Sequence, residues 1–330
     1  MKETLIRPTF LDQKHIQLSV DTSGYCQARC QECVWPELRS AKRIMTLGEF
    51  GALLDSLDGF SFEELALNSI NEPFVDKTIL EKLRMIIERR LPVRSLFFSS
   101  NWLLPNDAKI KDFAQIVATA DETPEINWVS INATASGIDH RTYDVLQAGI
   151  ELENAAVPYR ALNFELAVHN IVLLAKELEA RLNGRKRMRL HIKAYGDLFD
   201  QETYHAIWRT KLLDAGVSQA FFDRHIQVLL NHAFQTFGRA DADLTPSSSR
   251  RVCMSKWLDT QIVVGPDGKV GLCCIEGAHK VNVVYLLRQS LAEVVNVAPY
   301  QRLLRVLSGA ESANPGDPCA NCEYFVRVAK

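Results

Sequence analysis

The sequence lacks several features that would assign it to a broad class at once. It has no apolar run long enough to span a bilayer, residues 1–14 contain no hydrophobic segment of a secretion signal, and the formal net charge is only −2. These absences predict a cytoplasmic protein that uses neither a membrane nor a nucleic acid as a partner. The one basic run, Arg185–Arg189, predicts a solvated turn before a strand.

Histidine and cysteine differ in what they indicate about metals. The eight histidines show no spacing typical of metal ligands. The eight cysteines are more informative, because a cytoplasmic compartment keeps thiols reduced and disfavours disulfides. The cysteines are therefore interpreted as metal ligands or reactive thiols.

The length and the order of apolar patterns predict an α/β protein. At 330 residues, 47% of them hydrophobic, the chain can form one large α/β domain and a smaller one. Up to about residue 235, short β-rich runs alternate with helical stretches, as in successive βα units around a parallel sheet. The predicted strands are Ile16–Val20, Glu64–Asn68, Ser95–Ser99, Ile126–Asn132, Arg187–Lys193 and His225–Leu230. The predicted helices are one that opens at the capping box Thr46–Glu49, then Ile79–Arg90, Ala108–Ala118, Phe164–Leu182 and Thr203–Leu213.

Three cysteines follow the first predicted strand on one short segment: Cys26, Cys30 and Cys33. Three thiolates can hold three irons of a [4Fe–4S] cluster and leave the fourth iron open, whereas a structural zinc site takes four ligands. An open iron indicates chemistry at the cluster. A disulfide or a zinc site is the alternative interpretation.

This CxxxCxxC spacing resembles the motif of the radical S-adenosylmethionine (radical SAM) enzymes, in which SAM occupies the open iron. The resemblance implies a partial (β/α)6 barrel whose substrate enters from the side. It also implies reductive cleavage of SAM to a 5′-deoxyadenosyl radical, with electrons from an external donor of the flavodoxin or ferredoxin type. In such sheets the ligands gather at the carboxyl ends of the strands.

Further segments resemble the SAM contacts of that family. Asn71-Glu72-Pro73 is similar to a glycine–glutamate–proline segment that holds the SAM amino group, with Asn in place of Gly. The other residues for which the resemblance implies SAM contact are Ser100 and Asn101 after the third predicted strand, and Ser130 and Asn132 on the fourth. Glu32 replaces an aromatic residue that packs against adenine in that family, so either Trp35 or Val34 is expected to do this packing. An ordinary loop cap is the alternative for each polar segment.

The C-terminal part resembles the auxiliary-cluster domains called SPASM and twitch. A linker over Thr245–Arg251 precedes a predicted hairpin over Gln261–Val270. We expect residues 1–238 to form the barrel and residues 239–330 the auxiliary domain. The ligands implied for a second [4Fe–4S] cluster are Cys253, Cys273, Cys319 and Cys322. Four ligands favour the twitch form, and a Zn(Cys)4 ribbon is the alternative.

Three other side chains have open roles. Cys274 is either a small buried residue or a catalytic thiol that exchanges a hydrogen atom with the substrate. His191 and Lys193 are expected to alternate along their strand, so that one of them at most faces the barrel interior.

The implied function is an oxidation or epimerisation of a small molecule such as a sugar, a cyclitol or a natural product. The first predicted strand begins near residue 16, which leaves no room before it for a peptide-recognition domain. Modification of a ribosomal peptide by a radical SAM maturase is the alternative, and a non-catalytic iron–sulfur redox protein is a third possibility. Specificity resides in the shape of the pocket, so the sequence does not name the substrate.

Overall fold

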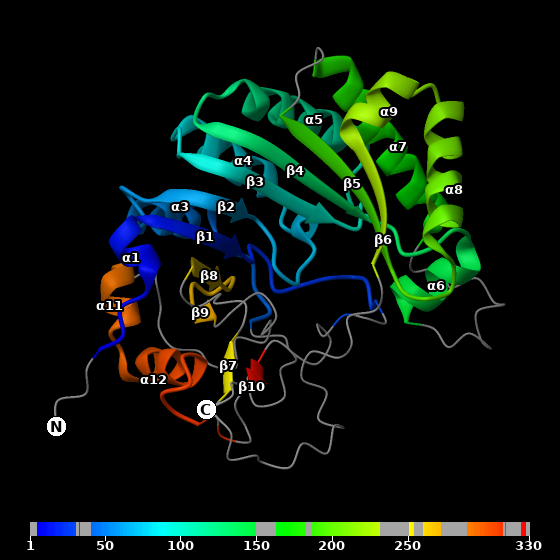
Figure 1. Ribbon diagram of the computed structural model, residues 1–330. Coiled ribbons are helices and arrows are strands. Elements are labelled where there is room, and N and C mark those ends of the chain that lie inside the picture. The colour runs from blue at the N-terminus through cyan, green and yellow to red at the C-terminus, as the bar shows by residue number, and fades with distance from the viewer. Residues whose placement is uncertain are drawn as a thin grey trace.

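The computed structural model describes residues 5–30, 33, 41–149, 163–182, 187–231, 251–253, 260–271, 289–312, 314 and 325–327 (Figure 1). Its centre is one sheet with the strand order β6-β5-β4-β3-β2-β1-β8-β9. The first six strands along the chain are β1 (His15–Val20), β2 (Ser61–Ala66), β3 (Val93–Ser100), β4 (Ile126–Thr134), β5 (Met188–Tyr195) and β6 (Ile226–Asn231). Each pairs in parallel with its neighbour. All six predicted strands and the predicted α/β class are confirmed.

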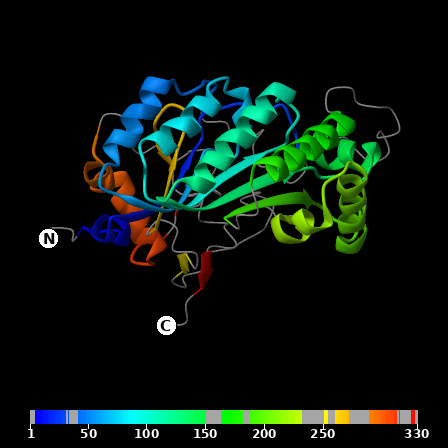
Figure 2. The ribbon, with the colours of Figure 1, turned by 90° about the horizontal axis from the view of Figure 1, so that it is seen from above.

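The helices between these strands cover one face of the sheet. Figure 2 shows α3, α4, α5 and α7 on one side of the strands, and the short β7–β10 ribbon on the other. The helices of this part of the chain are α1 (Thr9–Gln13), α3 (Leu47–Ser56), the 3-10 helix η1 (Pro73–Val75), α4 (Ile79–Glu88), α5 (Asp107–Glu122), α6 (His140–Ala148), α7 (Phe164–Arg181), α8 (Gln201–Asp214) and α9 (Gln219–His225). Four of them, α1, η1, α6 and α9, were not predicted.

Local capping explains why several helices begin where they do. The capping box predicted at Thr46 and Glu49 is present, because the Thr46 side chain accepts from the Glu49 N–H and the Glu49 carboxylate accepts from the Thr46 N–H. Asn106 and Asp200 cap α5 and α8 through the N-cap side chain, which accepts from the backbone N–H three residues further along the chain.

The strands present different side chains to the two faces of the sheet. On the face covered by helices, Leu65, Leu96 and Val129 are buried neighbours on β2, β3 and β4. The next residues in register point to the other face and are more polar, as with Ser130 of β4 beside Arg189 of β5. The apolar core therefore lies between the sheet and the helices, and the inner face is free to carry polar groups.

The C-terminal segment contributes to the same sheet. β8 (Gln261–Val264) pairs in parallel with β1, and β9 (Val270–Gly271) pairs antiparallel with β8, which confirms the predicted hairpin. β8 is buried on both faces, so its short apolar run suits a strand inside a sheet as well as a hairpin in a separate domain. The expected domain boundary at residue 238 stays a prediction.

The remaining described elements follow β9 or form the small ribbon. α11 (Leu291–Val295) and α12 (Ala298–Leu307) are joined to the N-terminal segment by Gln301, whose side chain exchanges two hydrogen bonds of 2.8 Å with the Ile6 backbone. β7 (Arg251–Cys253) and β10 (Phe325–Arg327) form a two-stranded antiparallel ribbon. No helix in the described ranges is both long enough and apolar enough to cross a membrane.

Candidate active site

The cysteine loop begins at the carboxyl end of β1 and is held there by backbone hydrogen bonds. The Gly24 N–H donates to the Arg43 carbonyl (2.8 Å), and the Arg29 N–H donates to the Gln147 carbonyl at the end of α6 (3.0 Å). A Cβ atom at Gly24 would lie 1.6 Å from the Ala41 carbonyl oxygen, so only glycine fits this turn. The described part of the loop is therefore held by the segment before α3 and by the end of α6.

Cys26, Cys30 and Cys33 are all half-buried on this loop, and none of them is in a disulfide. The Cys33 N–H donates to the Cys30 carbonyl (2.9 Å). Burial raises the pKa of Cys30 well above its ordinary value, and the neighbouring Cys33 and Cys26 raise it further. The three sulfurs are thus close enough to act on one another electrostatically.

The donor set of this loop fits an iron–sulfur cluster better than a bare metal ion. Within the described ranges, no three His, Cys, Asp or Glu side chains are arranged to hold a metal ion directly. A cluster differs from a single ion because its irons lie apart, and each iron needs only one thiolate. Iron binding deprotonates a coordinating thiol, which overcomes the raised pKa of Cys30.

The segment after β2 packs directly against the cysteine loop. The Glu72 N–H donates to the Tyr25 carbonyl (3.1 Å), which places Asn71 and Pro73 beside the loop. Asp21, the first residue after β1, accepts from the Ser69 N–H (2.7 Å) and thereby ties the two loops together. The resemblance implied SAM contact here, and the segment does lie beside the cysteines.

The Asn71 side chain has the strongest sign of an absent ligand. Its amide nitrogen and its amide oxygen are both buried, and neither has a hydrogen-bond partner among the described residues. A buried amide without a partner costs free energy, so such groups normally meet a ligand or water. Asn71 therefore fits a polar group of SAM.

The Glu72 carboxylate also links parts of the protein to one another, and its implied contact with SAM stays a prediction. It is 2% exposed and accepts three hydrogen bonds, from the Phe74 N–H (3.0 Å), the Ser100 hydroxyl (2.8 Å) and the Asn101 N–H (2.9 Å). Burial raises the pKa of Glu72 to about 7, against the lowering effect of these three donors. Glu72 and Ser100 join the loops after β2 and β3, so they position the site.

Asn101 connects the loop after β3 to the cysteines. Its amide Nδ2 donates to the Cys26 sulfur (3.9 Å), and its Oδ1 accepts from Gln27 (2.9 Å) and from the Leu103 N–H (3.1 Å). A hydrogen bond to a ligating sulfur tunes the potential of an iron–sulfur cluster. Asn101 thus contacts the first cysteine directly.

An aromatic cluster supports these loops from the helix side. Trp102 is fully buried and adopts a left-handed backbone conformation (φ +57°), which is rare for a bulky residue. Its ring packs edge-on against Phe74 and Phe113, with centroids 5.2 and 5.3 Å away. The strained backbone at Trp102 is held by this packing, and the loop is correspondingly rigid.

The inner face of the sheet carries the remaining predicted contacts. Ser130 and Asn132 of β4 both face inward, and the buried Asn132 Oδ1 has no partner among the described residues. His191 and Lys193 are two positions apart on β5 and share this face, so the expectation that only one of them faces inward is wrong. A strand has a repeat of two residues, which places positions 191 and 193 on the same side.

The basic run before β5 is also placed differently from the prediction. Arg189 lies inside the strand on the inner face, with its guanidinium 5.5 Å from the centre of the Trp128 ring. Arg187 donates to the Ile126 carbonyl (3.4 Å). Of the described residues of the run, Met188 and Arg189 thus belong to the sheet, because the strand begins at Met188.

Several predicted site residues cannot be placed. Trp35, Cys273, Cys274, Cys319 and Cys322 lie outside the described residues. For Cys253 the structure describes the backbone alone, which pairs with Phe325 between β7 and β10. Their assignments stay predictions.

Some residues of the site were missed at the level of sequence. Asp21, Gln27 and Gln147 all hold the cysteine loop, yet none belongs to the segments singled out above. Asp21 could have been found from its place directly after β1. Gln147 could not, because its contact with Arg29 depends on how α6 packs.

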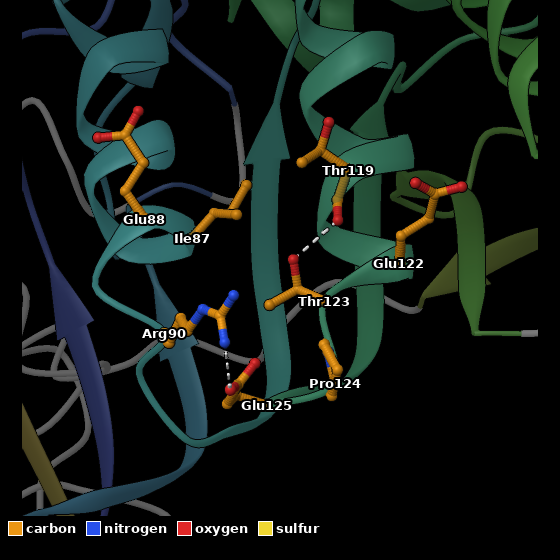
Figure 3. A pocket seen from close by; sticks show the side chains of 8 residues that line it. All are labelled: Ile87, Glu88, Arg90, Thr119, Glu122, Thr123, Pro124 and Glu125. Carbon is orange, nitrogen blue, oxygen red and sulfur yellow. Dashed lines mark hydrogen bonds and ion pairs between the residues drawn. The ribbon is translucent and has the colours of Figure 1, made fainter.

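A pocket lies at the other end of the strands from the cysteine loop (Figure 3). It is lined by Ile87, Glu88, Arg90, Thr119, Glu122, Thr123, Pro124 and Glu125, at the ends of α4 and α5 and before β4. They lie in the last turns of α4 and α5 or in the segments that lead from these helices to β3 and β4, so the pocket faces the amino ends of the strands. It is therefore separate from the cysteine loop.

Comparisons with known proteins agree with this arrangement. The family model of SPASM, an iron–sulfur cluster-binding domain, matches residues 253–323, which include all five C-terminal cysteines. No curated protein matches the chain.

Three solved structures share the fold of almost the whole chain. BtrN in complex with AdoMet and 2-DOIA is 12% identical (TM-score 0.51, 94% of this chain and 93% of that one). Native anSMEcpe with bound AdoMet is 13% identical (TM-score 0.52, 93% and 86%). Streptococcus suis SuiB bound to precursor peptide SuiA is 11% identical (TM-score 0.55, 95% and 72%).

Proposed function

We propose that this chain, which combines the radical SAM fold with a C-terminal SPASM domain, uses SAM and two iron–sulfur clusters to oxidise or epimerise a small molecule. The observation that carries the proposal is that three cysteines outside any disulfide meet, at the carboxyl end of the sheet, the Asn71 amide, which has no partner among the described residues. This is the edge at which open α/β sheets bind ligands.

Each element of the site has a task in this proposal. Cys26, Cys30 and Cys33 would hold three irons of a [4Fe–4S] cluster, and Asn71 would bind a polar group of SAM on the open iron. When bound, the first cluster and SAM would supply a 5′-deoxyadenosyl radical that removes a hydrogen atom from the substrate. The auxiliary cluster would supply an electron acceptor. The chain itself orients the reactants and excludes water.

Residues of the loops and the SPASM region decide the outcome after hydrogen abstraction. Cys253, Cys273, Cys319 and Cys322 would hold the acceptor for an oxidation, while Cys274 would return a hydrogen atom in an epimerisation. An external reductant of the flavodoxin or ferredoxin type would supply the electron that reduces the first cluster. We favour oxidation, because it uses the domain that the family model identifies.

A peptide substrate is the second candidate. It is favoured by the similarity to SuiB, whose structure holds a precursor peptide, and this match has the highest TM-score of the three. BtrN, a match of similar quality, binds 2-DOIA. A non-catalytic iron–sulfur protein would need no SAM site, which makes the unpartnered Asn71 amide an argument for catalysis.

The direct test is SAM cleavage by anaerobically reconstituted protein. With a strong reductant, we expect 5′-deoxyadenosine and methionine in equal amounts, and about eight irons per chain, four for each cluster. Tightly bound zinc with a single cluster would contradict the auxiliary-cluster assignment. Protein that carries both clusters and binds SAM without cleaving it would contradict the enzyme assignment.

A further inference from the structure

We propose that Lys193, on the inner face of β5, binds an anionic group of the substrate, either a carboxylate or a phosphate. This inference rests on the proposed function and adds a substrate class to it. It begins from the position of β5, which lies between β4 and β6 inside the sheet.

The composition of β5 is unusual for an interior strand. Its residues alternate strictly between buried apolar side chains toward the helices and half-buried polar ones on the inner face. The inner-face residues are Arg189, His191, Lys193 and Tyr195. Interior strands of parallel sheets are usually apolar on both faces, so this polarity indicates that the inner face meets water or a polar ligand.

The charges that the described residues place on this face are unbalanced. Among them, Glu64 of β2 is the one carboxylate that acts electrostatically on Lys193, and its Oε1 already accepts from Gln17 (3.0 Å). Among the described residues, the Lys193 ammonium forms no hydrogen bond or ion pair, and Arg189 adds a second positive charge. Burial lowers the pKa of Lys193 and raises that of Glu64.

The other described neighbours of Lys193 do not neutralise it. Burial, together with Lys193 and Arg189, lowers the pKa of His191 to about 4, so the imidazole is neutral. Thr134 of β4 and Leu229 of β6 stand beside Lys193 in register and carry no charge. The surplus positive charge is complementary to an anion, and a charge-assisted hydrogen bond to Lys193 would fix its position.

The position of Lys193 favours the substrate over SAM as the source of this anion. Tyr195 is the last residue of β5, at the carboxyl end of the strand, and Lys193 is the inner-face residue one step closer to the amino end. The cysteine loop likewise begins at the carboxyl end of β1. SAM would be anchored at that loop, so the anionic group at Lys193 is assigned to a second molecule.

Competitive acetylation of the full, reconstituted chain tests this assignment. The rate at which acetic anhydride modifies Lys193 is followed by peptide mass spectrometry against pH, with SAM present at saturation. Acetate and inorganic phosphate are the anionic probes, acetamide is the neutral isostere of acetate, and potassium chloride keeps the ionic strength equal. Lys111, exposed on α5, is the internal control.

A bound anion favours the protonated amine, so acetate or phosphate should raise the apparent pKa of Lys193 and slow its acetylation severalfold. Acetamide should have no effect, and Lys111 should be unaffected by all three. Glu64→Gln removes the competing carboxylate and should lower the acetate concentration needed. Equal effects of acetate and acetamide, or none from either anion, would overturn the proposal.

Two further outcomes show whether the anion comes from SAM or from the substrate, and whether the Lys193 site or the proposed function fails. If SAM alone protects Lys193 completely and the probes add nothing, the anion site belongs to the SAM carboxylate and the substrate assignment is wrong. SAM cleavage is measured in the same samples. Anion protection without SAM cleavage would leave the Lys193 site standing and overturn the proposed function alone.

Discussion

Asn101 donates its backbone N–H to Oε2 of Glu72 at 2.9 Å, across 29 positions of the chain. This bond joins the loops that follow β2 and β3, and the Asn101 side chain continues the connection to the Cys26 sulfur. A buried carboxylate thus holds the loop that contacts the first cysteine.

The two groups of cysteines should differ in what they support. Changing Cys26, Cys30 or Cys33 to Ala should abolish SAM cleavage, because the open-iron cluster loses a ligand. Cys319→Ala should retain some SAM cleavage while product formation stops, because the auxiliary cluster does not bind SAM. The measurement is 5′-deoxyadenosine formed under anaerobic reduction. An equal loss in both groups, with folding intact, would argue against separate roles.

Asn71 should act on SAM affinity and not on folding. Its amide has no partner among the described residues, so Asn71→Ala should weaken SAM binding about tenfold, the value of one good hydrogen bond, and leave the free energy of unfolding nearly unchanged. Asn106→Ala is the matched control. It removes the cap of α5 and should cost about 1 kcal/mol of stability without affecting SAM.

Calorimetric titration with SAM and urea denaturation measure the two effects. The reverse pattern, with Asn71→Ala unstable and normal in SAM affinity, would show that Asn71 serves the fold.

Glu72 should make stability fall as the pH rises. Burial raises its pKa in the folded state from 4.5 to about 7, so the native protein holds a proton that the unfolded chain releases between these values. The free energy of unfolding should therefore decrease across this window, by on the order of 3 kcal/mol. Glu72→Gln cannot titrate, and its stability should depend less on pH.

Urea denaturation at several pH values between about 5 and about 8 follows this difference. Glu88→Gln, at the exposed end of α4, is the control and should follow the parent curve. Parallel curves for the parent and Glu72→Gln would mean that Glu72 is ionised throughout.

Lys82 and Asp76 should behave as a coupled buried pair. Both side chains are at most 1% exposed, and the Lys82 ammonium also donates to the Met45 carbonyl at 2.5 Å, at the end of the cysteine loop segment. Lys82→Met should cost about 3–5 kcal/mol, because it leaves the Asp76 carboxylate buried without its partner. Adding Asp76→Asn should recover part of this loss.

Thermal unfolding of the single and double variants gives the coupling free energy between the two side chains. Additive losses in the double variant would show that the pair contributes no more than its separate packing.

The Cys274→Ala variant tests whether the reaction is an epimerisation or an oxidation. If its thiol returns a hydrogen atom, product made by the parent in deuterated water should carry deuterium, because thiols exchange their proton with water. The Cys274→Ala variant should then form 5′-deoxyadenosine but little product. Normal turnover of this variant, together with the absence of solvent deuterium, would retire the hydrogen-donor role and leave oxidation.

The local patterns of the chain determined the elements of the fold. The capping box at Thr46 and the alternation of strands with amphipathic helices are short-range features, and each of the six predicted strands overlaps one in the structure. The spacing of Cys26, Cys30 and Cys33 is equally local. Such features depend on neighbours in the sequence, which is why they could be predicted without a structure.

Tertiary structure alone decided which residues meet. The burial of Lys82 beside Asp76, the three donors on Glu72 and the placement of β8 beside β1 join positions that lie far apart or on separate elements. His191 and Lys193 share one face of their strand, and the helices on the opposite side of the sheet make that face the inner one. Periodicity says which side chains share a face, but packing decides whether that face becomes core or binding site, because burial depends on contacts that no local pattern contains.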